Sequence, residues 1–166
     1  MQETRLVQVL MELGRRKKFS WRITNNDCPI TNFTDMRVEI HKKDLILYHV
    51  AHELAHIYIG ACASAKEEPL HEILAEQIAV EVKAAFGYER TADDQEYIRG
   101  WARYGKITKA AIKNYEAYVL GISASIVKET RRIYDASYAI GGSGKPVGQY
   151  SARVQLNTKP SHRRGL

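Results

Sequence analysis

The feature that most constrains this chain is the segment Val50–Gly60, with the sequence VAHELAHIYIG. Its histidines, His52 and His56, are four residues apart, and an α-helix turns once every 3.6 residues. We therefore expect both imidazoles on one helical face, where they can hold one metal ion. Glu53 directly follows His52 and can reach a water molecule on that ion. The remaining residues of the segment are uncharged, which favours a buried helix.

Two imidazole ligands and an intervening carboxylate that acts as a base form the arrangement of zinc hydrolases. The alternative is a core helix whose histidines only find hydrogen-bond partners. A single buried histidine would favour that alternative, whereas this pair, with a glutamate between its members, favours a metal site. We predict that His52 and His56 bind Zn2+ and that Glu53 is the catalytic base.

A catalytic zinc ion needs a third protein ligand and keeps one position open for water. The next segment, Glu67–Gly87, carries Glu72 and Glu76 four residues apart, so these acids share a helical face. We assign Glu72 as the third ligand and Glu76 as the acid that orients a ligand imidazole. The reverse assignment of the two acids stays open. His71 is a further alternative, because zinc also accepts three imidazoles.

The motif HELAH followed by EILAEQIA resembles the gluzincin branch of zincin metallopeptidases. In that branch a glutamate on a later helix completes the site, and an acid four residues further on supports a histidine. The chain is more narrowly similar to zincin-like peptidases of bacteriophages and mobile elements, including the C-terminal domain of plasmid antirestriction proteins. Their Glu-x-x-Ala-Glu core is matched by Glu72, Ala75 and Glu76. Their Tyr-Ile-x-x-Trp segment is matched at residues 97–101.

This resemblance covers about residues 44–133. It implies a zincin-like fold with the HExxH motif on its active-site helix, and hydrolysis of peptide bonds in a protein or peptide substrate. The chain departs from the antirestriction proteins in having no room for their N-terminal domain, which binds single-stranded DNA. The spacing between His56 and Glu72 is also short, which keeps the choice of third ligand open.

Composition indicates one soluble globular domain, with 45% hydrophobic and 27% charged residues. The most apolar stretch, Leu45–Ile59, is interrupted by three histidines and one glutamate, so we expect no membrane span. The N-terminus lacks the organisation of a signal peptide. We expect a cytoplasmic protein, or one associated with a virion, whose Cys28 and Cys62 are reduced thiols.

The net charge of +6 is unevenly distributed along the chain. Residues after Ile140 include five basic residues and no acid, and the rest of the chain is close to neutral. We therefore expect a zincin-like domain at 1–140 and a Gly-rich linker with a basic, extended tail at 141–166. This tail motivates a non-enzymatic alternative, in which a zincin-fold protein binds phage structural proteins in a virion, or acts as an antirestriction factor on nucleic acid.

The predicted fold class is α+β, mostly helical with a small N-terminal sheet. Alternating apolar residues predict strands at 19–24, 36–41 and, in the tail, 150–156. Helical periodicity predicts helices at 3–17, 45–60, 69–87, 92–104 and 108–134. Asp44 is the expected N-cap of the metal-binding helix. The strand at 36–41 is either an edge strand that pairs with a substrate backbone or an internal strand.

Overall fold

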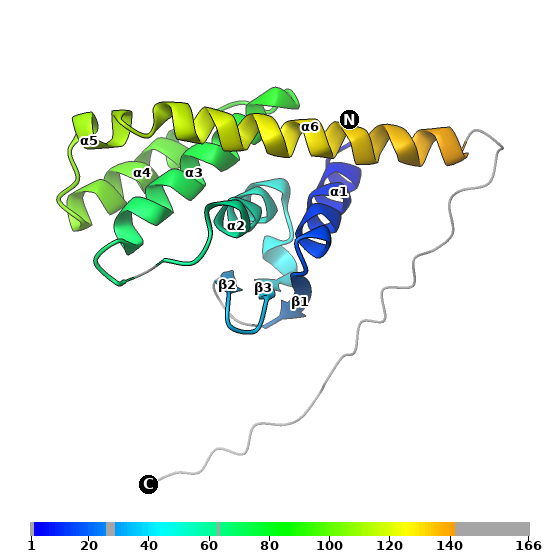
Figure 1. Cartoon of the computed structure of the whole chain (residues 1–166), viewed down its shortest axis with the longest axis horizontal. Coiled ribbons are helices and arrows are strands. Elements are labelled where there is room, and N and C mark those ends of the chain that lie inside the picture. Colours follow the sequence, from blue (N-terminus) through cyan, green and yellow to red (C-terminus); the bar gives the residue numbers. More distant parts are fainter. Residues whose placement is uncertain (1, 26–28, 63, 142–166) are drawn as a thin grey trace, which may run out of the picture.

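The computed structural model describes residues 2–25, 29–62 and 64–141 of the chain. Within these ranges the fold is α+β, with six α-helices and a small mixed sheet near the N-terminus, which confirms the predicted class (Figure 1). The predicted linker and tail, including the strand at 150–156, lie outside the described residues apart from Gly141. Cys62 carries a free, exposed thiol, and Cys28 lies outside the described residues.

The helices and the short 3-10 turn that precedes α2 are α1 (Glu3–Arg16), η1 (Lys42–Asp44), α2 (Leu47–Ile59), α3 (Glu68–Ala85), α4 (Ala92–Tyr104), α5 (Lys109–Lys113) and α6 (Glu116–Gly141). The bounds of α4 are those predicted, because Thr91 and Asp94 form a reciprocal capping box at its start. The prediction of a single helix at 108–134 is wrong. The chain forms α5 and α6, separated by a turn at Asn114 and Tyr115, and asparagine favours turns over helix interiors.

The start of α2 also differs from the prediction. Asp44 belongs to η1, and Ile46 occupies the N-cap position of α2 without a side-chain hydrogen bond. The predicted capping role of Asp44 is therefore wrong. The helix ends as expected at Gly60, whose φ of 96° lies in the left-handed region that glycine adopts readily.

The sheet contains β1 (Ser20–Thr24), β2 (Ile30–Asn32) and β3 (Arg37–His41) in the order β1-β3-β2. Strand β1 runs parallel to β3, and β2 runs antiparallel to it. The edge-strand interpretation of 36–41 is therefore wrong, and the internal alternative is correct. The sequence reading missed β2, because three residues are too few to show an alternation. This strand is the edge of the described sheet that contacts α2.

Helix α2 lies in the middle of the molecule (Figure 1). It packs against α1 and α3, and β2 also contacts it. Large side chains that are fully buried come from every layer, among them Leu6 and Leu10 of α1, Ile40 of β3, Leu54 of α2, Ile78 of α3 and Ile126 of α6. Replacing Leu54 by alanine at this central position would cost about 2–5 kcal/mol of stability. The core thus fixes the face that α2 turns toward α3.

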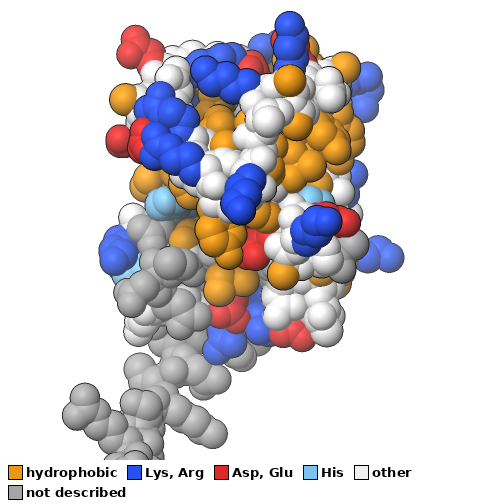
Figure 2. All heavy atoms as spheres, turned by 90° about the vertical axis from the view of Figure 1, so that its left-hand side faces the viewer, with side chains coloured by type: hydrophobic (Ala, Val, Ile, Leu, Met, Phe, Trp, Pro, Cys, Tyr) orange, Lys and Arg blue, Asp and Glu red, His pale blue; other side chains and the backbone are white. Residues whose placement is uncertain are grey.

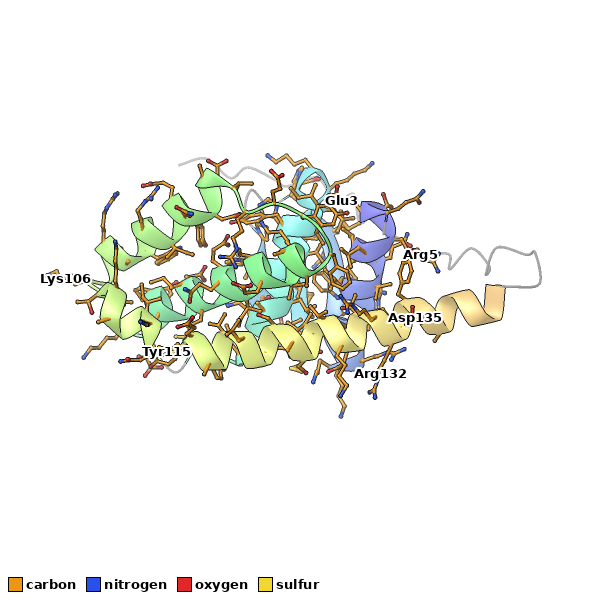
Figure 3. The ribbon with its side chains drawn as sticks, turned by 90° about the horizontal axis from the view of Figure 1, so that it is seen from above. Glu3, Arg5, Lys106, Tyr115, Arg132 and Asp135 are labelled. Carbon is orange, nitrogen blue, oxygen red and sulfur yellow. The ribbon has the colours of Figure 1, made fainter. Side chains whose placement is uncertain are left out.

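Helix α6 covers one side of this core. It packs along α3 and reaches α1, where the Arg5 guanidinium lies 4.5 Å from the centre of the Tyr134 ring. Seen from above, Arg5 lies beside the part of α6 that carries Asp135 (Figure 3). None of the helices in the described ranges combines the length and the hydropathy that a transmembrane span requires.

Candidate metal centre

Three possible metal ligands meet where α2 packs against α3. His52 and His56 lie one turn apart on α2, and Glu72 comes from the first turns of α3. The two helices are in extensive contact, so the acid faces the imidazole pair. His52 is 7% exposed, and the side chains of His56 and Glu72 are 15% and 19% exposed. The group is therefore mostly buried but open enough for a small ligand to enter.

The distances between the donor atoms fit one small cation. The two Nε2 atoms of His52 and His56 are 3.1 Å apart. The Glu72 carboxylate places Oε2 3.3 Å from His52 Nε2 and Oε1 3.4 Å from His56 Nε2. Zinc bonds of 2.0–2.1 Å in a tetrahedron put neighbouring ligand atoms about 3.3 Å apart. His52, His56 and Glu72 could therefore hold a metal ion with little movement.

Glu76 contacts the opposite nitrogen of His52. Its Oε2 lies 3.0 Å from His52 Nδ1, and the Tyr48 hydroxyl donates to the same oxygen at 3.0 Å. A proton on Nδ1 leaves the lone pair of Nε2 directed toward His56 and Glu72. Glu76 is fully buried, so its contact orients the imidazole without competition from bulk water.

The metal-free centre attracts positive charge. Burial alone would lower the pKa of His52, but its hydrogen bonds to Glu72 and Glu76 outweigh burial and raise this pKa to about 9. Burial would raise the pKa of Glu72, but hydrogen bonds from His52, His56 and Tyr97 hold it well below its usual range. The Glu72 carboxylate is thus ionised at neutral pH. In the metal-free centre its negative charge is balanced by the extra proton on His52, and a bound cation could balance it instead.

Tyr97 of α4 contacts the Glu72 carboxylate. Its hydroxyl donates to Glu72 Oε2 at 2.7 Å, and its ring lies 5.6 Å from the His52 ring, centre to centre. Burial, together with the hydrogen bond to Glu72 and the negative charge of that residue, raises the pKa of Tyr97 above its usual value. The phenol therefore stays protonated and can keep donating to Glu72.

A residue of the sheet holds the Glu53 side chain in place. Its side chain is 5% exposed, and the Thr31 hydroxyl of β2 donates to its Oε2 at 2.6 Å. Because Glu53 adjoins His52 on α2, its negative charge also favours the protonated form of that imidazole. The edge strand thus fixes the orientation of the carboxylate that the sequence analysis assigned as catalytic base.

The structure separates the three candidates for third ligand. Glu72 lies among the imidazole Nε2 atoms, whereas Glu76 lies on the Nδ1 side of His52. His71 falls into a different group of possible ligands, together with Cys62 and Glu67. The geometry therefore favours Glu72 over Glu76 and His71.

Sequence reasoning missed Thr31 and Tyr48. Neither residue belongs to a motif. Thr31 reaches Glu53 through the packing of β2 against α2. Tyr48 lies one helical turn before His52 on α2, a spacing that places it beside that imidazole, and it reaches Glu76 through the packing of α3 against α2. Tyr97 was noted within the Tyr-Ile-x-x-Trp segment, but its contact with Glu72 could not be read from the spacing.

Comparisons with protein families, with curated proteins and with solved structures find no match to this chain. The features that bear on function are therefore the geometry of the centre and the HExxH motif.

Proposed function

We propose that the protein is a zinc-dependent peptidase. The observation that carries the proposal is the spacing of 3.1 to 3.4 Å between the His52 and His56 Nε2 atoms and between each of them and one oxygen of the Glu72 carboxylate, with the buried Glu53 beside them. A mixed set of two imidazoles and one carboxylate suits zinc and is the ligand set of open, catalytic sites. The resemblance to zincin peptidases of phages and mobile elements points to peptide bonds as the target.

Each residue of the centre has a separate role in this proposal. His52, His56 and Glu72 would hold the zinc ion, which would supply a Lewis acid and make water more acidic. Glu53 would accept a proton from the attacking water and deliver it to the departing amine. Thr31 holds one oxygen of Glu53 in place, which leaves the other oxygen available for the proton. Glu76 keeps the proton of His52 on Nδ1, and Tyr97 steadies the ligand carboxylate.

Glu53→Gln tests the proposal, because it removes the basic carboxylate and keeps the shape of the side chain. We expect hydrolysis to fall by at least a hundredfold with zinc content unchanged. The full chain, loaded with zinc, would be incubated with a peptide library derived from a cell proteome, and new termini would be counted by mass spectrometry. Glu12→Gln, the same change on the exposed surface of α1, is the matched control.

Two results would contradict this role. Loss of zinc from the Glu53→Gln protein would make Glu53 a ligand. Equal numbers of new termini from the wild type and the variant would exclude Glu53 as the base. A zinc-loaded wild type that produces no new termini would contradict the peptidase proposal itself.

The second candidate function is a non-enzymatic phage or mobile-element protein that binds a virion component or nucleic acid. The uneven charge favours it, because five basic residues and no acid follow Ile140. This candidate requires binding to single-stranded DNA or to virion proteins that is lost when residues 142–166 are removed, with no peptide hydrolysis. Binding to DNA through the tail alone would weaken steeply with added salt.

A further inference from the structure

A groove on the surface adjoins the metal centre. It has a volume of about 450 Å³, is open to solvent, and is lined by residues of α4 and by the first residue of α3: Glu68, Tyr97, Gly100, Trp101 and Tyr104. Its volume falls in the range of about 300–1,000 Å³ that is usual for ligand clefts. Figure 2, which faces the side of the molecule where α5 lies, shows hydrophobic side chains reaching the surface between basic ones.

Tyr97 joins this groove to the metal centre. The same side chain lines the groove, donates to Glu72 and contacts the ring of His52. A peptide held at the centre would therefore have a neighbouring side chain within reach of the groove.

The groove wall is an aromatic row on one face of α4. The ring centres of Tyr97 and Trp101 are 6.3 Å apart, and those of Trp101 and Tyr104 are 5.7 Å apart. Tyr104 is 74% exposed, so this row does not serve only to fill the core. Aromatic rings at a surface attract guanidinium and ammonium groups through their π faces.

Glu68 gives the groove a negative charge. Its side chain is exposed, and within the described residues its carboxylate has no hydrogen-bond or ion-pair partner. The two arginines of α4 that neighbour the groove residues in sequence, Arg99 and Arg103, form ion pairs with Glu96 and not with Glu68. A free carboxylate beside an aromatic row is complementary to a cationic side chain.

Gly100 lines the groove without a side chain. A Cβ atom at this position would have no neighbour within 4 Å, so packing does not require glycine there. Glycine inside a helix costs about 1 kcal/mol relative to alanine. Gly105 differs, because its Cβ would lie 2.5 Å from Cβ of Pro69, and it lets the end of α4 approach the start of α3.

We infer that the groove formed by Glu68, Tyr97, Gly100, Trp101 and Tyr104 is a substrate subsite that binds an arginine or lysine side chain. The inference rests on the proposed peptidase function and adds a substrate preference to it. The cation lies against Trp101 and Tyr104 and pairs with the Glu68 carboxylate.

Binding can be measured without catalysis. N-acetyl-arginine amide would be titrated into the full, zinc-loaded chain while the indole N–H signals of its two tryptophans are followed by NMR. We expect a saturable shift of the Trp101 signal, with Trp21 as the internal reference. N-acetyl-citrulline amide, which has the same shape without the charge, should shift Trp101 much less. The Glu68→Gln protein should bind the arginine amide about two- to fivefold more weakly.

Gly100→Leu should fill the groove and abolish the shift. Gly121→Leu is the matched control, because Gly121 is also a helical glycine with no neighbour within 4 Å of an added Cβ, and it lies on α6. In the peptide-library assay, wild-type cleavage should show arginine or lysine at one fixed position relative to the cut. Gly100→Leu should lose this preference and still cleave other peptides.

The outcomes separate the two proposals. A Trp101 shift specific for the arginine amide, in a protein that cleaves no peptide, would contradict the peptidase function and support a cation-binding groove. Cleavage without any basic preference and without a Trp101 shift would overturn the subsite. Equal shifts with the arginine and citrulline amides would overturn the cationic occupant.

Discussion

The position of one proton on His52 determines whether its Nε2 atom can bind a metal ion. Glu76 holds that proton on Nδ1, and the Tyr48 hydroxyl donates to the same carboxylate oxygen. Lys83 lies over the Tyr48 ring and forms a buried ion pair with Asp94. The orientation of the ligand imidazole is thus supported by contacts that extend from α2 through α3 to the start of α4.

Glu76→Gln should weaken zinc binding by about 10- to 100-fold without abolishing it, because a neutral amide orients His52 but stabilises its bound form less. Competition with a chelator of known affinity measures the change. Glu81→Gln, the same substitution on α3 at a residue paired with Arg90, should leave the affinity unchanged. An unaltered affinity in Glu76→Gln would show that Glu76 does not support the ligand.

The residues predicted to be metal ligands, His52, His56 and Glu72, lie close together in the fold, but the prediction missed two residues that contact their surroundings, Thr31 and Tyr48. The spacing of His52 and His56, and of Glu72 and Glu76, follows from helical periodicity within single segments. Thr31 lies on β2, and its contact with Glu53 depends on how that strand packs against α2. Helical periodicity places Tyr48 on the same face of α2 as His52, but its contact with Glu76 depends on how α3 packs against α2.

At the scale of elements, α1 and β1 are joined by a close approach. A Cβ on Gly14 would lie 2.7 Å from Trp21 Nε1, and that indole nitrogen donates to the Met11 carbonyl at 2.8 Å. Position 14 therefore requires glycine because the Trp21 side chain leaves no room for a Cβ atom, and not because of the backbone conformation of the helix. The contact fixes the sheet relative to α1.

Gly14→Ala should lower the free energy of unfolding by about 1–3 kcal/mol, because the added methyl group displaces Trp21. Urea unfolding of the full chain measures this change. Gly121→Ala on α6 meets nothing within 4 Å and should be neutral or stabilise by up to about 1 kcal/mol. Equal effects of the two substitutions would contradict the close approach.

The elements that were predicted well carry strong local signals. The start of α4 follows from its capping box, and Pro69 lies in the first turn of α3. The elements predicted poorly depend on tertiary contacts. Strand β2 exists because β3 provides a pairing edge, and the central position of β3 cannot be deduced from its own alternation. The break at Asn114 interrupts a periodicity that continues on both sides.

At the scale of the whole molecule, the candidate metal centre makes the free energy of unfolding depend on pH and on the binding of a metal ion. The pKa of His52 is raised to about 9 in the metal-free fold, against 6.5 for an ordinary histidine. The folded state therefore binds this proton more tightly than the unfolded state does. The resulting stabilisation is fully present below about pH 6.5 and is lost as the pH rises through about 9.

Metal-free protein should thus lose stability between pH 6.5 and pH 9 relative to a His52→Gln variant. If zinc binds as proposed, it competes with the same proton, so its stabilising effect should increase over this interval. Urea unfolding at several pH values, with chelator and then with zinc, measures both trends. A wild type that gains stability relative to the variant over this range would contradict the raised pKa.

The most direct test of the account is a zinc titration of the full chain by calorimetry, against a competing chelator. It would be done in a Cys62→Ser background, which removes the separate group of Cys62, Glu67 and His71. We predict one tight site that is lost in both His56→Ala and Glu72→Ala and is retained in Glu53→Gln. Absence of a saturable site, or the same tight site in His56→Ala and Glu72→Ala, would contradict a metal centre at His52, His56 and Glu72.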